Sequence, residues 1–474
     1  MSGTARRGDQ LTAIAREARW VMTDPLLASV TRLGAAVIVA AGPWLVSVIA
    51  LALISVTMTP VMGFAAVEDL RLTVVYAFCI APLAAGPIGA IAARRVSAAI
   101  EAGQTGSVAE LFLSAAALSS AVAQVIAVLA CLALGIGPTG VAIGFVFLTG
   151  TAALLWTSFA VLAAVRAFGF LIAAFTGGMA LSVACAMAAA TRGPTTEILI
   201  WCFAVGLAFC VALSVRHVQR LFACRWLTLG ATFLDLLQHL RGNAVLCGGV
   251  LFAICGVWID KWVFWFGPDG VRSAAGYLHA SGYDSVMFLA HLSVIPSFAA
   301  LLIFHHGDLI AAIDRVHAAL AARATHALLR EAVQDLVRVA WSGVFTIVIV
   351  QSAVTIGLVL MSPVLERSLD FSFDQFLMLR IGFIGCFFHA VMFLSCAMLL
   401  VANRTRHFAL IQGAFLLLNL TLSVALYLAV GVSAYAFFIS ALAAGAVALY
   451  AAYRALLDYD YHLFLGENDS LYQK

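Results

Sequence analysis

Charged residues are scarce in this sequence: Lys, Arg, Asp and Glu together make up 10% of its 474 residues. An ordinary soluble domain is about one quarter charged. Hydrophobic residues instead make up 64% of the chain. This balance argues against a soluble globular protein and indicates an integral membrane protein.

Enzyme motifs are also missing. The sequence contains no Walker-type phosphate loop and no HExxH pattern. Membrane phosphotransferases need clustered carboxylates to bind metal and phosphate, but Asp260 stands nearly alone within the apolar segments. The ten Cys residues form no CxxC pair, and nine lie in or beside apolar segments, which favours apolar packing over disulfide or metal chemistry. We therefore predict that the chain is not an enzyme, hydrolyses no ATP and uses no metal or cofactor.

Long apolar segments dominate what is present. A membrane-spanning helix needs about 20 mainly apolar residues, and twelve such segments can be found. We therefore expect an all-α polytopic membrane protein with about 12 transmembrane helices. The predicted spans are residues 33–57, 72–93, 111–134, 141–165, 168–190, 198–215, 244–266, 285–304, 340–361, 381–402, 408–430 and 434–456.

The basic residues predict the orientation of these spans, because cytoplasmic loops hold an excess of Lys and Arg. If both termini are cytoplasmic, twenty basic residues lie on the inner side and five on the outer side, with Lys261 assigned to neither. Topology thus accounts for the basic residues, and the net charge of +3 is too small and dispersed to indicate a nucleic-acid partner. We expect a protein embedded in a lipid bilayer, with both termini in the cytoplasm.

The two halves of the span series resemble each other. Longer cytoplasmic connections follow the second and eighth spans, and very short basic connections follow the fourth and tenth. The second and eighth spans also contain prolines, at Pro82 and Pro87 and at Pro296. Matching interruptions are typical of the moving helices of transporters, so we predict hinges there, although prolines are also common in membrane helices generally. We predict two six-helix lobes related as same-sense repeats: an amphipathic N-terminus (1–32), an N-terminal lobe (33–215), a linker (216–243), a C-terminal lobe (244–456) and a tail (457–474).

Two adjacent charges, Asp260 and Lys261, interrupt the seventh span. With a cytoplasmic start near residue 244 and a rise of 1.5 Å per residue, Asp260 lies roughly 24 Å into a hydrocarbon layer about 30 Å thick. Trp258, Trp262 and Trp265 follow an i, i+4, i+7 pattern, as an interfacial aromatic belt would. One interpretation is therefore that the two charges snorkel to the outer surface within this belt.

The other interpretation is a gate or lining at the outer mouth of a polar pathway. Asp is too short to snorkel far, and adjacent helical residues point about 100 degrees apart, so each charge needs its own partner on another helix. Arg272, Asp284 and Arg380 lie at similar depth and are the candidate partners.

A few uncharged polar residues also lie within the spans. His389 and His291 could hydrogen-bond a neighbouring helix or carry protons, and a satisfied structural role is the simpler interpretation. The amides are expected to be interhelical hydrogen-bonding residues: Gln124, Gln351 and Asn419.

Several segments resemble the membrane exporters of the Pel exopolysaccharide system, the PelG family. The main one is VWIDKWVFW at 257–265, and the others are AGPWLVS at 41–47, GYDSVMFLA at 282–290, IPSF at 295–298 and LLVANR at 399–404. They occur in the family's order across nearly the whole chain. The residues matching the family's Asp-Lys-Trp and Gly-Pro-Trp are Asp260, Lys261 and Trp262, and Gly42, Pro43 and Trp44.

The resemblance implies a member of the multidrug/oligosaccharidyl-lipid/polysaccharide flippase superfamily, in which two six-helix lobes rock around a central cavity. It implies a protein of the bacterial inner membrane that carries a polysaccharide substrate, partly deacetylated and rich in galactosamine, to the periplasm. It also implies three partners: a cytosolic glycosyltransferase (the synthase), a cyclic-di-GMP receptor and a repeat-containing membrane protein. The expected pathway or gate residues are Asp260, Lys261, Trp262, Trp258, Gly42, Pro43, Trp44, Asp284 and His389.

Two alternative functions stay open. One is a lipid-linked oligosaccharide or drug flippase of the same superfamily. An ion-coupled transporter of that kind needs carboxylates near the midplane, and the N-terminal lobe has none outside its loops. The other alternative is a scaffold that transports nothing and anchors the synthase through the charged connection 308–338.

Overall fold

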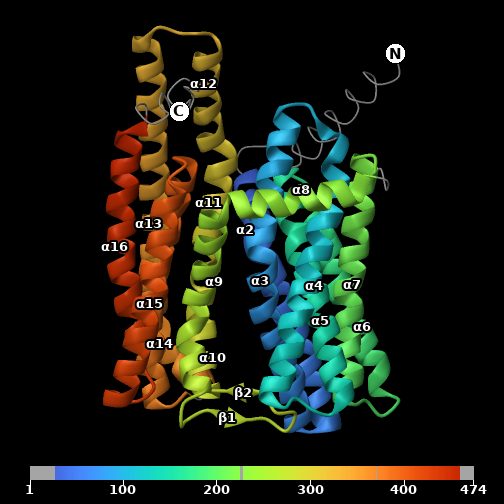
Figure 1. The fold of residues 1–474 in the computed structure, drawn as a ribbon. Helices are drawn as coiled ribbons and strands as arrows, with labels where there is room; N and C mark the ends of the chain where they lie inside the picture. The colour runs from blue at the N-terminus through green and yellow to red at the C-terminus, as the bar shows by residue number, and fades with distance from the viewer. Residues whose placement is uncertain (1–26, 225–227, 370, 460–474) are drawn as a thin grey trace. The chain divides into compact units, whose positions relative to one another are not determined.

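The computed structural model describes residues 27–224, 228–369 and 371–459 (Figure 1). The side chains of residues 27–44 and of His306 lie outside this description. Most of the predicted amphipathic N-terminus and most of the predicted tail therefore also lie outside the described residues.

The described residues form twelve helical segments that are long and apolar enough to cross a membrane, and each predicted span overlaps one of them. The predicted all-α, twelve-span fold class is therefore confirmed. Eleven of the segments are single helices: α2 (Leu27–Met62), α3 (Phe64–Glu101), α4 (Val108–Leu134), α5 (Thr139–Ala164), α6 (Phe168–Ala190), α7 (Thr196–Leu221), α9 (Ala244–Trp265), α13 (His326–Leu369), α14 (Phe373–Val401), α15 (Thr405–Val430) and α16 (Tyr435–Leu457).

The remaining segment, Ser281–Ala321, is the eighth along the chain and consists of several shorter elements. α10 (Ser281–Leu292) ends before Ser293, and α11 (Ile295–Phe304) begins after Val294. A π-helical turn, η4 (His305–Leu309), then leads into α12 (Ile310–Ala321). The predicted loop 305–339 is thus mostly helical, because α12 and the first turns of α13 fill it.

The chain divides into two compact units. The first contains the described residues up to Thr31, Ala41–Trp258 and Phe264–Ala280, and the second contains Arg32–Ala40, Ile259–Val263 and the described residues from Ser281 onward. Most of α9 therefore groups with the first unit, whereas the predicted C-terminal lobe begins at residue 244. The lobe boundaries remain a prediction, as does the relation of the two lobes as repeats.

In the first unit, which also contains most of α2, α8 (Leu229–Gly242) and most of α9, the helices α3 to α7 pack as a bundle. Gly178 on α6 and Gly206 on α7 allow these two helices to pack closely: a Cβ at Gly206 would lie 2.2 Å from the carbonyl oxygen of Gly178. The hydroxyl of Ser182 donates to the carbonyl oxygen of Phe203 across the same interface, at 3.2 Å. Small residues and interhelical hydrogen bonds are the usual means of association for helices in lipid, which supplies no hydrophobic drive between them.

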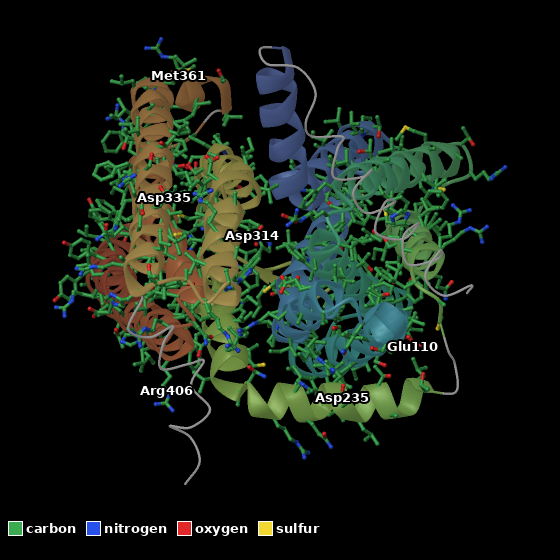
Figure 2. All side chains as sticks on the ribbon, turned by 90° about the horizontal axis from the view of Figure 1, so that it is seen from above. Glu110, Asp235, Asp314, Asp335, Met361 and Arg406 are labelled. Carbon is green, nitrogen blue, oxygen red and sulfur yellow. The ribbon has the colours of Figure 1, made fainter. Side chains whose placement is uncertain are left out.

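Two smaller elements lie at opposite ends of this bundle (Figure 1). The amphipathic helix α8 (Leu229–Gly242) lies across one end, where Arg95 of α3 pairs with Asp235 (labelled in Figure 2). At the other end is an antiparallel hairpin of β1 (Val271–Arg272) and β2 (Leu278–His279). The predicted topology also places the linker and this connection on opposite sides of the membrane.

The second unit contains α10 to α16, with α14 at its centre and packed against α10, α13 and α16. Gly385 lets α14 approach α16 closely, since a Cβ there would lie 2.8 Å from the ring of Phe437. α12 and the first turns of α13 extend past the ends of α14 to α16 (Figure 1). Arg315 of α12 and Asp335 of α13 (labelled in Figure 2) hold this extension together with an ion pair of 2.5 Å.

Candidate transport site

The charges of α9 lie inside the second unit. Asp260 is fully buried, with 0% of its surface exposed, and Lys261 is 7% exposed. The hydroxyl of Tyr283 on α10 donates to Oδ2 of Asp260 at 2.6 Å. Oδ1 of Asp260 accepts from the backbone N–H of Lys261 at 2.9 Å and lies 3.4 Å from its Nζ. The snorkelling interpretation is therefore wrong for Asp260, whose carboxylate is enclosed by protein and bonded to another helix.

Two of the three partners predicted from depth, Arg272 and Arg380, bond to other residues. Nη1 of Arg272 donates to the carbonyl oxygen of Leu134 at 2.5 Å. Nε of Arg380 donates to the hydroxyl of Ser362 at 2.7 Å, and its guanidinium lies 4.3 Å from the ring centre of Phe376. The expectation that Asp260 bonds to another helix is confirmed, but its partner is Tyr283, which sequence reasoning missed.

The sequence contains only a weak indication that Tyr283 belongs to the site. Tyr283 lies beside Asp284 at the start of the eighth span, within one of the segments that resemble the exporter family. Tyr283 is nearly fully buried, and a buried phenol needs a hydrogen-bond partner. Asp284 is half-buried beside it.

A group of aromatic and imidazole rings lies near these charges in the second unit. The ring centre of His291 on α10 is 6.3 Å from that of His389 on α14, and Phe437 of α16 lies within 5.7 Å of both. Nδ1 of His291 is 2.7 Å from the carbonyl oxygen of Met287. Among the described residues, Nε2 of His291 is buried and makes no hydrogen bond. Both histidines lie within range of the charge of Lys261. The tertiary structure therefore brings Asp260, Lys261, His291 and His389 into one region.

The predicted tryptophan belt is wrong for Trp265. Trp265 is 3% exposed and stacks on Tyr76 of α3, with ring centres 4.8 Å apart, inside the first unit. Trp258 is half-buried and packs edge-on against Trp265 at 6.2 Å. Trp262 is half-buried and belongs to the second unit. The three side chains therefore do not form one surface belt.

The hairpin after α9 is fixed to the start of α3. The carboxylate of Asp69 accepts from the backbone N–H of Ala275 at 3.1 Å, and the hydroxyl of Tyr76 donates to the carbonyl oxygen of Leu278 at 2.7 Å. Tyr277 is fully buried, and this burial raises the pKa of its phenol well above the ordinary value. The buried carboxylate of Asp69 thus holds the hairpin against α3.

The break between α10 and α11 has its own polar partners. Ser297 donates to Oε1 of Gln351 at 2.5 Å, and Nε2 of Gln351 donates to the carbonyl oxygen of Ser293 at 3.3 Å. The prediction that Gln351 bonds between helices is therefore confirmed. Pro296 lies in the first turn of α11, directly after the break.

The other predicted hinge and pathway residues lie within continuous helices. α3 runs without interruption through Pro82 and Pro87. Gly42, Pro43 and Trp44 lie within α2, but their side chains are outside the described residues.

The fold is that of a known class of membrane transporters. A MATE transporter of Vibrio cholerae, VcmN, has a TM-score of 0.62 at 14% identity, covering 95% of this chain and 98% of that one. An outward-facing multidrug resistance MATE transporter of the MOP superfamily has a TM-score of 0.57 at 13% identity, covering 94% and 98%. A MOP superfamily transporter from Pyrococcus furiosus has a TM-score of 0.55 at 12% identity, covering 94% and 98%. At these identities the likeness shows the fold alone.

The family is narrower than the fold. Residues 18–464 match the PelG family of exopolysaccharide exporters (EPS-E), so the chain belongs to this family. None of the curated protein sequences compared with the chain matches it. The family and the fold are those of transporters, which agrees with the prediction that the chain is not an enzyme.

Proposed function

We propose that this chain moves a Pel-type exopolysaccharide, partly deacetylated and rich in galactosamine, from the cytoplasm to the periplasm. Membership of the exopolysaccharide exporter family over residues 18–464 carries this proposal. The MATE-like fold and the twelve apolar helices support it, because they provide the framework of a transporter. The protein resides in the bacterial inner membrane, as the family resemblance implies, and the excess of basic residues on one side supports a cytoplasmic location for both termini.

The pair Asp260 and Lys261, together with Tyr283, forms a gate on this pathway. A buried ion pair has lost its hydration, and its mutual attraction only partly compensates for that loss. Water that enters beside α9 restores the hydration and lowers the cost of separating the charges. The bond from Tyr283 to Asp260 therefore favours a dry, closed arrangement, and a hydrated polymer favours an open one.

The remaining predicted pathway residues line the route of the sugar chain. Trp44, Trp258 and Trp262 stack against the apolar faces of sugar rings, and His389 hydrogen-bonds to hydroxyl groups. Asp284 lies beside Tyr283 and attracts a cationic polymer. Gly42 and Pro43 shape α2 beside Trp44.

The transport motion is a rocking of two six-helix lobes, residues 33–215 and 244–456, related as same-sense repeats. Pro296 is its principal hinge, because α10 and α11 already separate there and their freed polar groups are bonded to Gln351. Pro82 and Pro87 weaken α3 without breaking it, since each lacks the N–H that would complete the backbone ladder.

The cytosolic synthase binds the extension formed by α12 and the first turns of α13. This extension projects beyond the neighbouring helices (Figure 1), and Arg315 pairs with Asp335 (the latter labelled in Figure 2) within it. The cyclic-di-GMP receptor and the repeat-containing membrane protein complete the assembly, as the family resemblance implies.

The experiment is a complementation test in a host that makes the polymer but lacks this protein. Secreted polymer is measured with a galactosamine-binding lectin after supplying wild type, Asp260→Ala, Lys261→Ala or Asp269→Ala at matched membrane levels. Asp269 is exposed on the connection before the hairpin, so its substitution is the matched control. We expect secretion with wild type and the control and little with the other two variants.

The outcomes separate the exporter from the alternatives. A wild-type protein that restores no secretion refutes the exporter function. A scaffold that only anchors the synthase would secrete normally with Asp260→Ala, provided that the synthase still fractionates with the membrane. Secretion of a lipid-linked oligosaccharide instead of the polymer would favour a flippase for that substrate.

A further inference from the structure

A groove lies on the surface of the second unit, on the helices α13 and α16 and not at the charged site of α9. It has a volume of about 400 Å³ and is lined by Trp341 of α13 and by Ala446, Leu449, Tyr450 and Tyr453 of α16. This volume falls in the range of small-molecule sites. The rings of Trp341 and Tyr453 are 5.7 Å apart and form the part of the groove where α13 and α16 are close.

The two ends of the groove differ in chemistry. Ala446 and Leu449 make one end apolar, and the small side chain of Ala446 leaves room between the helices. At the other end Arg454 follows Tyr450 by one helical turn, and its Nη1 lies 3.5 Å from the Tyr450 hydroxyl. Arg338 precedes Trp341 by about one turn of α13 and is largely exposed. The groove therefore runs from an apolar part to a mouth with two guanidinium groups.

One polar atom in the groove wall has no partner. Among the described residues, Nε1 of Trp341 is buried and makes no hydrogen bond. A buried indole N–H usually finds an acceptor. The tyrosine hydroxyls and the guanidinium of Arg454 also provide donors. An occupant with anionic or other acceptor oxygens at one end and an apolar chain at the other would match the hydroxyl and guanidinium donors and the apolar end of the groove.

We propose that this groove binds an anionic phospholipid. The acyl chain packs along Ala446 and Leu449, and the headgroup phosphate accepts hydrogen bonds from Arg454 and Arg338. Two features support this occupant. The groove lies on helices that cross the membrane, and both arginines belong to the side that the sequence predicts to be cytoplasmic. Basic pockets between membrane helices on that side are suited to anionic headgroups.

The charges around the mouth favour an anion. Asp335 also lies one turn from Arg338, at 3.6 Å, but it is paired with Arg315 at 2.5 Å. Asp458 lies one turn beyond Arg454 and is exposed. In the described part of the chain, Arg454 forms no ion pair with it.

The test is native mass spectrometry of the purified full-length protein with added phosphatidylglycerol or phosphatidylcholine. Ala446→Phe fills the apolar end, and Val447→Phe is its control, because Val447 is exposed and does not line the groove. We expect wild type and the control to bind phosphatidylglycerol, and Ala446→Phe to bind it at least tenfold more weakly. Equal binding by the two variants overturns the site.

A second pair of variants tests the headgroup. The double variant Arg338→Gln with Arg454→Gln removes both guanidinium groups, and Arg406→Gln, an exposed basic residue elsewhere on the predicted cytoplasmic side (labelled in Figure 2), is the control. We expect the double variant to lose the preference for phosphatidylglycerol over phosphatidylcholine and the control to keep it. A retained preference overturns the assignment of the headgroup.

A photo-crosslinking residue at Tyr450 separates lipid from other occupants. Crosslinking to lipid supports the proposal. Crosslinking to a second copy of the chain, or to another segment of the same chain, overturns it. All three measurements use purified protein and are independent of polymer secretion, so their outcome is separate from that of the proposed function.

Discussion

Neutralising the buried pair tests whether Asp260 and Lys261 serve stability alone or transport as well. Asp260→Asn leaves the Lys261 ammonium, 7% exposed, without the carboxylate that lies 3.4 Å away. Removing one partner of a buried ion pair costs about 3–5 kcal/mol. Tyr283→Phe removes only the 2.6 Å hydrogen bond to that carboxylate, which is worth about 1.5–3 kcal/mol for a charged acceptor. Replacing both charges with apolar residues in the Tyr283→Phe background, as in Asp260→Leu with Lys261→Met (the double variant below), also removes the phenol hydroxyl that donates to Asp260, and such a replacement is often neutral.

The thermal unfolding midpoint in detergent should therefore decrease from the double variant to Tyr283→Phe and then to Asp260→Asn. Asp269→Asn, an exposed control, should match wild type. Polymer secretion at matched membrane levels provides the second measurement. We expect the double variant to be as stable as wild type but to secrete little, because an apolar pair gains nothing from water and the gate stays closed. Normal secretion by the double variant refutes the gate, and an Asp260→Asn protein as stable as the control refutes the argument from burial.

Three further substitutions test the packing within each unit. Gly276→Ala should lower the unfolding midpoint, at a cost of about 1–3 kcal/mol. Gly276 has a φ of +98°, and a Cβ there would lie 3.0 Å from a carbonyl oxygen of the α4–α5 connection. Gly230→Ala on α8 is the control, because Gly230 has open space around it. Gln351→Leu should cost about 1–3 kcal/mol, because it leaves the carbonyl oxygen of Ser293 without its donor, and an unchanged midpoint would show that this carbonyl is satisfied in another way. Gly206→Val should separate α6 from α7 and reduce the amount of folded protein in the membrane, measured by size-exclusion chromatography, since its Cβ would lie 2.2 Å from the carbonyl oxygen of the facing glycine.

The number of membrane-spanning helices and their positions along the chain could be predicted from the sequence. The predicted span 168–190 coincides with α6, and the predicted start of α9 at residue 244 is also correct. Apolar runs of this length have one favourable environment, and a helix satisfies every backbone group within the run itself. The helix extensions were harder to predict, because polar turns such as those at the start of α13 are helical only through contacts with a neighbour.

The partners of the charged residues were not predictable from depth. Tyr283 lies 23 residues after Asp260, and three arginine or aspartate side chains at similar height seemed equally suitable. Helix packing decided among them, since it turned Arg272 toward Leu134 and Arg380 toward Ser362. Trp265 likewise entered the interior of the first unit, because Tyr76 offers it a stacking surface there.

The sequence by itself determined that the chain crosses a membrane twelve times and that it resembles an exopolysaccharide exporter. Both conclusions depend on local information: hydrophobic runs along one segment, and residues in a fixed order. The tertiary structure alone decided that Asp260 is enclosed and bonded to Tyr283, and that the break before α11 is bonded to Gln351. Burial and hydrogen bonding arise only when helices distant in the chain pack together, and an apolar face has the same sequence whether it contacts lipid or protein.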